Sequence, residues 1–319
     1  MLPLKIIVTA LLVILLSVGT VEVSLATDLD LAEIQKAAEQ GDSVAQFKLA
    51  TYYMYGSKGI QKDDANAFKW FLKAAEQGVA RAQFWVGFMY DFGKGIKEDK
   101  AKAFEWYLKA AQNGEAEACQ SLGFLYKHGS DVVPKDETKS IEFYQKALTI
   151  FRKSAEQGNV WGYTGLAFMY ENGQGVTANE VEVEKWLNKA AEQGDMDSQY
   201  RLVGIYRKRN MPEKDITAIL LKWYQEDANK RGDARAQSGL GDMYYFGQGV
   251  EQNYYTAAYW YKKAVDQNYA AAQYSLGLMH LDGQGVILDR QMGCNLLRAS
   301  AEQGYRSAIE AYNDLCAVK

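Results

Sequence analysis

Few residues in this 319-residue chain are suited to catalysis or metal binding. The histidines are His128 and His280, and the cysteines are Cys119, Cys294 and Cys316. A catalytic triad needs a histidine beside a nucleophile and a carboxylate, but these two histidines lie in distant segments without such companions. A structural zinc site needs four Cys or His ligands together, and the scatter of the cysteines argues against one. We therefore expect no enzyme activity, no metal site and no cofactor.

The overall charge narrows the classes of partner. Lys and Arg number 36 against 40 Asp and Glu, which gives a net charge of -4. Such a chain lacks the basic surface that releases counterions from nucleic acid, so we expect no nucleic-acid partner. With 48% hydrophobic residues it can bury a large core.

The first 26 residues have the pattern of a secretory signal peptide. Lys5 precedes an apolar run at 6–16, and Ser24-Leu25-Ala26 forms a small-x-small cleavage pattern. We expect cleavage after Ala26 and export to the periplasm or the medium, the alternative being an uncleaved anchor. No later segment resembles a membrane span, so we expect none in the mature chain.

The rest of the chain is one motif repeated, which indicates the elements that position every candidate residue. Ala-Ala-Glu-Gln-Gly ends at Gly41, Gly78 and Gly194, and weaker copies recur at intervals of 36 to 38 residues, with one interval of 44. Apolar residues at helical spacing on both sides of a Gly-x-Gly loop predict two antiparallel helices per unit.

Short polar residues stand where the second helix of each unit begins. We expect them to be N-caps rather than catalytic acids, because a short acceptor satisfies the free amides of the first turn. They are Asp63, Asp99, Asp136, Asn179, Asp215, Asn253 and Asp289. A large apolar residue seven positions after most of them, such as Trp70 or Trp106, predicts the core seam between units.

The repeated unit resembles the Sel-one-like repeat family, relatives of tetratricopeptide repeats. The pattern Ala-Gln-x-x-Leu-Gly-x-x-Tyr-x-x-Gly-x-Gly-Val followed by Trp-Tyr-x-Lys-Ala is matched closely at 236–249 and 260–264. The resemblance implies an all-α fold, a right-handed α/α superhelix or solenoid of about seven helix-pair repeats. It also implies a scaffold whose concave groove recognises a protein or peptide.

The repeats divide the mature chain, 27–319, into consecutive segments that form one solenoid. We expect a leading helix at 28–41, repeats at 42–78, 79–114, 115–158, 159–194, 195–232, 233–268 and 269–304, and a trailing helix at 305–319. The long third interval adds seven residues, almost two helical turns, to the second helix of the third repeat.

Two features are candidates for partner binding. The first is a row of aromatic residues along the face of the first helices, which line the groove in related arrays: Phe47, Phe84, Phe88, Phe124 and Phe168. The alternative is that these rings pack between adjacent helices. The second is an exposed basic loop, Arg207, Lys208 and Arg209 before Pro212, which would contact an acidic partner or membrane head groups unless it is only a solvated turn.

Cys294 and Cys316 lie ten residues before and twelve residues after Gly304. Two antiparallel helices that turn near Gly304 bring both to the same end of the last hairpin, and export favours oxidation. We predict one disulfide between them if the side chains face each other, with Cys119 left as a single buried thiol.

Three classes of function follow from these residues. The first is an exported, monomeric scaffold that binds a protein or peptide in its groove. The second is a periplasmic immunity or inhibitor protein that neutralises a toxin or hydrolase, which resembles a role of some family members. A weak cell-wall or lactam hydrolase is a minor alternative.

Overall fold

The computed structural model describes residues 31–317, and every regular element within this range is helical. The predicted signal peptide, residues 1–26, lies outside the described residues. Among the helices of 31–317, none has the length and apolar character needed to cross a membrane. The chain divides near Ala190 into two compact units, which we call the first unit (31–190) and the second unit (191–317).

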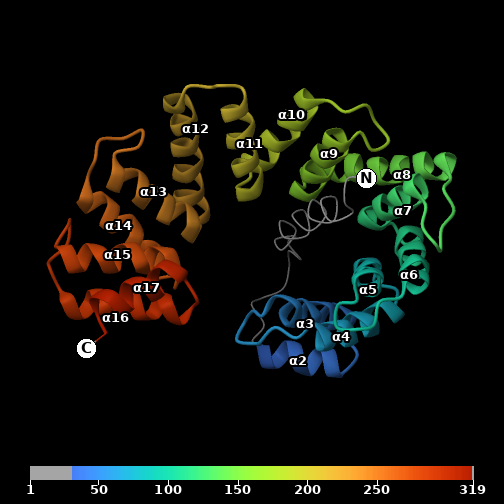
Figure 1. Ribbon diagram of the computed structural model, residues 1–319, viewed down its shortest axis with the longest axis horizontal. Helices are drawn as coiled ribbons and strands as arrows, with labels where there is room; N and C mark the ends of the chain where they lie inside the picture. Colours follow the sequence, from blue (N-terminus) through green and yellow to red (C-terminus); the bar gives the residue numbers. More distant parts are fainter. Residues whose placement is uncertain (1–30, 318–319) are drawn as a thin grey trace. The chain divides into compact units, whose positions relative to one another are not determined.

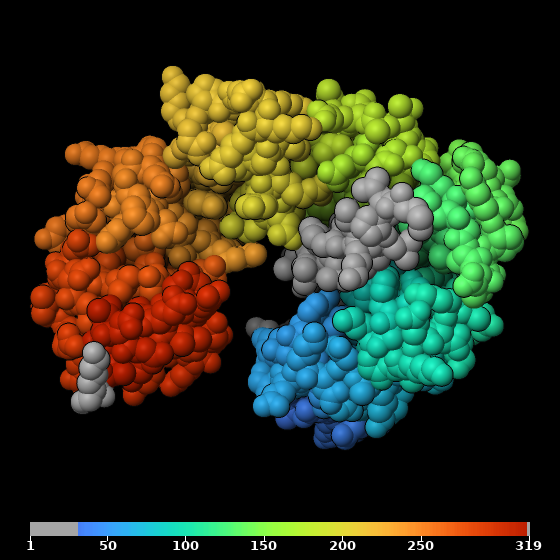
Figure 2. Space-filling model, viewed as in Figure 1, coloured from blue at the N-terminus to red at the C-terminus, as the bar shows by residue number. Residues whose placement is uncertain are grey.

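The first unit is a leading helix followed by four helix pairs, and consecutive helices from α2 to α9 pack against each other (Figure 1). The leading helix is α2 (Leu31–Glu39), and the pairs are α3 (Ser43–Tyr55) with α4 (Asp64–Glu76), α5 (Ala80–Phe92) with α6 (Lys100–Gln112), α7 (Ala116–His128) with α8 (Glu137–Glu156), and α9 (Val160–Asn172) with α10 (Glu180–Ala191). We call the first helix of a pair helix A and the second helix B. In the space-filling view, α2 (blue) to α8 (green) form one continuous packed surface (Figure 2).

The second unit continues the same pattern with three pairs and a trailing helix (Figure 1). The pairs are α11 (Met196–Lys208) with α12 (Glu213–Glu226), α13 (Ala234–Phe246) with α14 (Tyr254–Val265), and α15 (Ala270–Asp282) with α16 (Arg290–Glu302), and the trailing helix is α17 (Arg306–Leu315). A π-helical turn, η2 (Asp227–Arg231), follows α12. The all-α solenoid predicted from the sequence is confirmed in these sequential helix pairs.

Six of the seven predicted N-caps are confirmed. Asp63, for example, accepts hydrogen bonds from the amides of Ala65 and Asn66 at 3.0 and 2.9 Å. The same role falls to Asp99, Asp136, Asn179, Asn253 and Asp289. The prediction for Asp215 is wrong, because α12 begins directly after Pro212 and Asp215 lies within its first turn. Proline presets a backbone angle suited to a helix start, so no side-chain cap is needed there.

The predicted core seam lies one residue later than expected. Trp70 and Trp106 are only half-buried, and a lysine three residues on covers each ring, with Nζ 4.2 Å from the ring centroid. The next residue in each helix B is at most 4% exposed: Phe71, Tyr107, Tyr144, Leu187, Tyr261 and Leu297. The tryptophans of the B helices therefore lie at the edge of the buried stripe, except Trp223, which is buried.

The motif glycine of helix A receives these buried side chains. A Cβ atom at Gly87 would lie 2.8 Å from Cδ1 of Tyr107, and one at Gly241 would lie 2.5 Å from Cδ1 of Tyr261. Real Cβ atoms do not approach a ring so closely, so only glycine lets the two helices of a pair meet at this spacing.

Buried glutamines join consecutive pairs. In the first unit, Gln46 donates to the carbonyl of Ala38 in the preceding helix and accepts from Gln77, which directly follows its own helix B, at 3.1 and 2.8 Å. Gln83 makes the matching bonds to Ala75 and Asn113. In the second unit the position is held by Gln199, Gln237 and Gln273. In the third and fourth pairs Cys119 and Tyr163 replace the glutamine, so this link is interrupted there.

The lengthening of the third helix B is confirmed. α8 has 20 residues, against 13 in α4 and α6, and its buried residues continue along one stripe from Tyr144 through Leu148 and Phe151 to Ala155. Because seven residues are almost two full turns, the insertion extends the helix without rotating its apolar face.

Candidate functional site

The predicted row of exposed aromatic residues is largely core, which corrects that prediction. Phe84, Phe88 and Phe168 are 1%, 9% and 5% exposed. Phe84 lies 5.8 Å from Tyr107 between ring centroids, and Phe88 lies 4.6 Å from Phe92. These rings fill the space between neighbouring helices, as aromatic residues at helical spacing usually do.

Two members of the row remain partly exposed. Phe47 packs against Phe71 at 5.4 Å, and Phe124 packs against His128 at 4.3 Å. Of the five rings in the predicted row, only these two can therefore contribute directly to a surface of the first unit.

A charged cluster lies on the A helices of the same unit. Arg81 of α5, Glu117 of α7 and Trp161 of α9 occupy one position, the residue before the motif small residue, in three consecutive repeats. Nη1 of Arg81 lies 3.2 Å from Oε1 of Glu117, and the indole Nε1 of Trp161 donates to the same oxygen at 2.6 Å. The guanidinium carbon of Arg81 lies 5.9 Å from the Trp161 ring centroid. Three helix pairs thus meet at one carboxylate.

Glu115 completes the cluster, which we call the Arg81 cluster (Arg81, Glu115, Glu117 and Trp161). It stands at the N-cap position of α7 but makes no side-chain cap hydrogen bond. Its Oε1 instead accepts a hydrogen bond from Nη1 of Arg81 at 3.3 Å. Glutamate is longer than the usual capping residues, so its carboxyl group reaches across to the neighbouring repeat.

Burial strengthens the electrostatic interactions between the charged groups of this cluster. Glu115 and Glu117 are 6% and 2% exposed, and Arg81 is partly exposed. Burial and the neighbouring Glu117 raise the pKa of Glu115 well above its ordinary value. Burial also acts to raise the pKa of Glu117, but Arg81, Glu115 and Trp161 outweigh it and lower this pKa. Burial would lower the pKa of Arg81, but Glu117 and Glu115 outweigh it and raise this pKa.

This arrangement is suited to recognition rather than to covalent chemistry. It holds an arginine, two carboxyl groups and an indole, and Tyr55, 40% exposed at the end of α3, is close enough to interact electrostatically with Arg81. Arg, Trp and Tyr are the side chains that most often carry binding energy at protein interfaces. Sequence reasoning missed the cluster, although aligning the repeats on their motif alanine would have shown Arg81, Glu117 and Trp161 at one position.

The predicted basic segment is exposed but differs in its structure. α11 extends to Lys208, so Arg207 and Lys208 belong to its last turn and only Arg209 to Pro212 form the connection to α12. Nη2 of Arg207 forms an ion pair with Oε1 of Glu213 at 2.7 Å, and this partner holds the pKa of Glu213 below its ordinary value. The ion pair reduces the positive charge that the segment presents.

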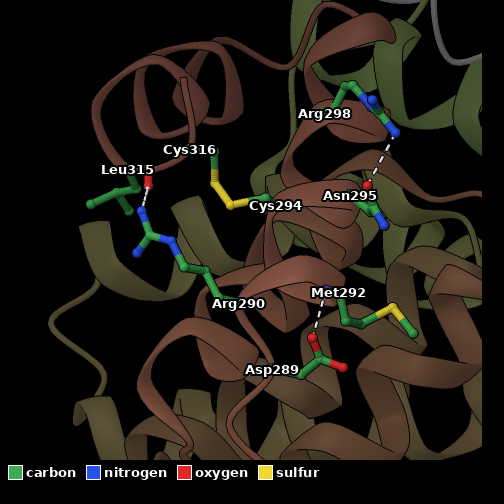
Figure 3. The surroundings of a disulfide bond; sticks show 8 residues. All are labelled: Asp289, Arg290, Met292, Cys294, Asn295, Arg298, Leu315 and Cys316. Atoms are coloured by element: carbon green, nitrogen blue, oxygen red, sulfur yellow. Dashed lines mark hydrogen bonds between the residues drawn. A yellow bond between two sulfur atoms is a disulfide. The ribbon is translucent and has the colours of Figure 1, made fainter. Parts of the chain in front are cut away.

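The three cysteines lie in different environments. Cys294 of α16 and Cys316, which follows α17, form a disulfide with Cα atoms 5.5 Å apart (Figure 3). Beside it, Nη2 of Arg290 donates to the carbonyl of Leu315 at 2.6 Å. Cys119 is a free, buried thiol, and burial is the main cause that raises its pKa to about 12, so it is a poor nucleophile.

The two histidines lie in different helices, α7 and α15. His128 ends α7 beside Phe124, and burial with Lys127 and Lys135 lowers its pKa. Nδ1 of His280, in α15, lies 3.1 Å from the carbonyl oxygen of Ile287. Within residues 31–317 no group of three or more His, Cys, Asp or Glu side chains is arranged to hold a metal ion.

A family model supports the architecture. The Sel1 repeat model matches residues 43–79, 80–115, 116–149, 162–195, 234–269 and 270–305, more than half of the chain. The chain belongs to the Sel1 repeat family. These repeats typically mediate protein interactions.

Two solved structures, a Sel1 repeat protein and a protein with an SLR fold, align with most of this chain. One from Oxalobacter formigenes is 32% identical, with 95% of this chain and 85% of that chain covered, at a TM-score of 0.49. A protective antigen of uropathogenic Escherichia coli with an SLR fold is 30% identical, with 89% and 74% covered, at a TM-score of 0.36.

The match to curated relatives is more local. The chitin synthase regulator SKT5 of Saccharomyces cerevisiae is 41% identical over 69 residues, which are 21% of this chain and 10% of SKT5. An ERAD-associated E3 ubiquitin-protein ligase component of Arabidopsis thaliana, HRD3A, is 39% identical over 67 residues, with the same two shares. The chain thus spans about a tenth of the length of these relatives.

The unmatched stretches are those in which the Sel1 pattern is altered. The third match ends at residue 149, inside the lengthened α8, and no match covers 196–233. The latter stretch contains the basic segment, Pro212 and the π-helical turn. Three members of the Arg81 cluster, Arg81, Glu115 and Glu117, lie within matched repeats, and Trp161 directly precedes the match at 162–195.

Proposed function

We propose that this protein is an exported Sel1 repeat scaffold that binds a protein or peptide partner on the A helices of its first unit. Its signal peptide, residues 1–26, would be removed after Ala26, and the repeats would form the mature protein. Finding Thr27 as the N-terminal residue of the protein recovered from the periplasm or the medium would test export.

The Arg81 cluster is the observation that carries this proposal. Stacking of repeats does not require a charged side chain at this position, because it holds Val44 in the first repeat and Ala271 in the last. Replacing a buried ion pair by apolar residues is often neutral or stabilising, so buried charges are not needed for the fold itself. Charges kept at this position, beside Trp161 and Tyr55, are better explained by recognition of a partner.

A neutral version of the cluster tests the role in binding. The triple variant Arg81→Met, Glu115→Gln, Glu117→Gln removes the charges without leaving one unpaired, so it should fold. Pull-down from envelope extract followed by mass spectrometry would identify the partner, and titration calorimetry would give its affinity. We expect the triple variant to lose about 2 kcal/mol or more of binding free energy.

The matched control is Arg235→Met, which changes the same repeat position in α13 of the second unit. It should retain the affinity of the unchanged protein. Equal affinity of the triple variant, with native helical content by circular dichroism, would contradict the proposal.

The same experiments separate the other functions. A one-to-one nanomolar complex with a single toxin or hydrolase would favour an immunity or inhibitor protein, whereas weaker binding of several partners would favour a general scaffold. Turnover of cell-wall or lactam substrates that is lost in His128→Ala or His280→Ala would instead identify an enzyme.

The basic segment is proposed as a second contact, for an acidic partner. Changing Arg207, Lys208 and Arg209 to Ser should lower the association rate at low salt, because exposed charges act mainly by steering. Stability should stay within about 0.5 kcal/mol, as for other surface changes. An unchanged association rate, measured by stopped flow, would show that the segment makes no contact with the partner.

A further inference from the structure

The Arg81 cluster contains one more carboxyl group than its single guanidinium can neutralise. Oε1 of Glu115 and Oε1 of Glu117 lie 3.3 and 3.2 Å from the same atom, Nη1 of Arg81. Both glutamates are less than 10% exposed. Two ionised carboxylates at these distances would leave a net negative charge in a site with little access to water, which is costly.

One carboxylate oxygen of Glu117 lacks a hydrogen-bond donor among the described residues. Its Oε1 accepts from Arg81 and from Nε1 of Trp161. Its Oε2 is buried and receives no N–H or hydroxyl donor from the residues that the structure describes. A buried acceptor without a donor is unfavourable, and a protonated neighbouring carboxyl group would supply one.

We propose that Glu115 is protonated and donates this proton to Glu117, so that one shared proton acts as a pH-sensitive latch between the A helices α5, α7 and α9. The proton compensates the second carboxyl group and satisfies the free oxygen of Glu117. Its loss leaves two buried carboxylates against Arg81, which favours separation of α7 from α5 and α9.

The groups around the pair are consistent with this assignment. α3 contributes Tyr55, which interacts with Arg81, and α5 contributes Arg81 itself. α7 contributes Cys119, and Lys146 of α8 acts to lower the pKa of this thiol. α9 contributes Trp161, which is a neutral donor. Among these groups, Arg81 is the cation that acts on both carboxyl groups.

The direction of the pH effect follows from the pKa shifts. The pKa of Glu115 is raised from 4.5, so its contribution to stability is complete below this value and is lost as the pH rises towards the pKa in the folded protein. The pKa of Glu117 is lowered, so its contribution is present above 4.5 and is lost as the pH falls through its folded value. The coupled pair should therefore hold one proton between these limits and release it on the alkaline side.

Infrared spectroscopy of the full-length protein tests the proton directly. At neutral pH we expect the C=O band of a protonated carboxyl group, which Glu115→Gln removes. The matched control is Glu105→Gln, at an exposed glutamate of α6, which should keep the band. Glu117→Gln is a second test, because Glu115 should then ionise beside Arg81 and the band should again disappear. Absence of the band in the unchanged protein, or its persistence in Glu115→Gln, would overturn the proposal.

Hydrogen exchange at the amides of α7 tests the latch. The equilibrium constant for opening of the unchanged protein should be compared with that of Glu115→Gln at the same pH. Above the pKa of Glu115 in the unfolded chain, their ratio should rise by up to about tenfold per pH unit, since one proton is released on opening. Parallel pH dependences in the two proteins would overturn the latch.

Regulation of partner binding by this proton rests on the proposed function, whereas the proton itself does not. If the carboxyl band is present and is removed by Glu115→Gln, but the triple variant keeps the partner affinity of the unchanged protein, the proposed function is rejected and the latch is not. A missing carboxyl band with reduced affinity in that variant would reject the latch alone.

Discussion

Glycines inside the helices stand in two different environments, and the difference can be measured. A Cβ atom at Gly87 in α5 would clash with the buried ring of Tyr107, whereas one at Gly204 in α11 would have no atom within 4 Å. Gly87→Ala should therefore destabilise by about 1–3 kcal/mol through overpacking. Gly204→Ala should stabilise by about 0.4–1 kcal/mol, because alanine restricts the unfolded chain and favours the helix.

Urea denaturation followed by circular dichroism would compare these two variants with the unchanged protein. Destabilisation by both would show that the space at Gly204 is occupied in solution. Stabilisation by both would show that Tyr107 can move away from α5.

Single residues were predictable from the sequence where their role depends on nearby chain. Asp63 caps α4 because the amides it binds are two and three residues away. The exposure of Phe84 was not predictable in this way, because it depends on Tyr107 of the next helix. The Arg81 cluster was harder still, since its members come from three repeats and form a site only when stacking brings them together.

At the level of elements, the length of an insertion determines whether a helix can accommodate it without a change in its buried face. The seven extra residues in α8 are nearly two turns and continue its buried stripe. In α12 the spacing of Trp223 departs from the repeat, and the helix ends in the π-helical turn η2. There Nε2 of Gln199 donates to the buried Asp227 at 2.8 Å, and Asp227 also pairs with Arg231. The periodicity of the sequence predicted the lengthening of α8, but the π-helical turn after α12 depends on these tertiary contacts.

The trailing helix α17 is the element that most needs its disulfide. Ala308 is its one buried residue among those described, whereas Ile309 and Leu315 are 42% and 43% exposed. We expect Cys316→Ser to cost about 2–4 kcal/mol and to increase hydrogen exchange in 305–317, because the bond restricts an otherwise weakly held end. Thiol titration of denatured, unreduced protein should find one free thiol, that of Cys119.

Cys119→Ser is the matched control for that experiment. It removes the free thiol but leaves the disulfide, so exchange in α17 should be unchanged. Three free thiols in the unchanged protein would mean that the bond does not form in solution.

For the whole molecule, the repeat period was the strongest predictor. Intervals of 36 to 38 residues predicted consecutive helix pairs, because each pair can bury its apolar face only against its neighbours. The division into two compact units near Ala190 was not predicted. The pattern of buried glutamines does not predict this boundary, because the glutamine is already replaced at Cys119 and Tyr163, before Ala190.

This nearest-neighbour organisation predicts that damage to one repeat stays local. Phe151 of α8 is 1% exposed, packs against Trp161 of α9 at 4.9 Å between ring centroids, and fills the space beside Gly165. Phe151→Ala should cost about 3–5 kcal/mol, because it leaves a cavity between the third and fourth pairs. Hydrogen exchange should increase in α7 to α10 and remain unchanged in α13 to α16, since repeat stability is a sum of local terms. A uniform increase in exchange along the chain would instead show that the two units unfold as one cooperative body.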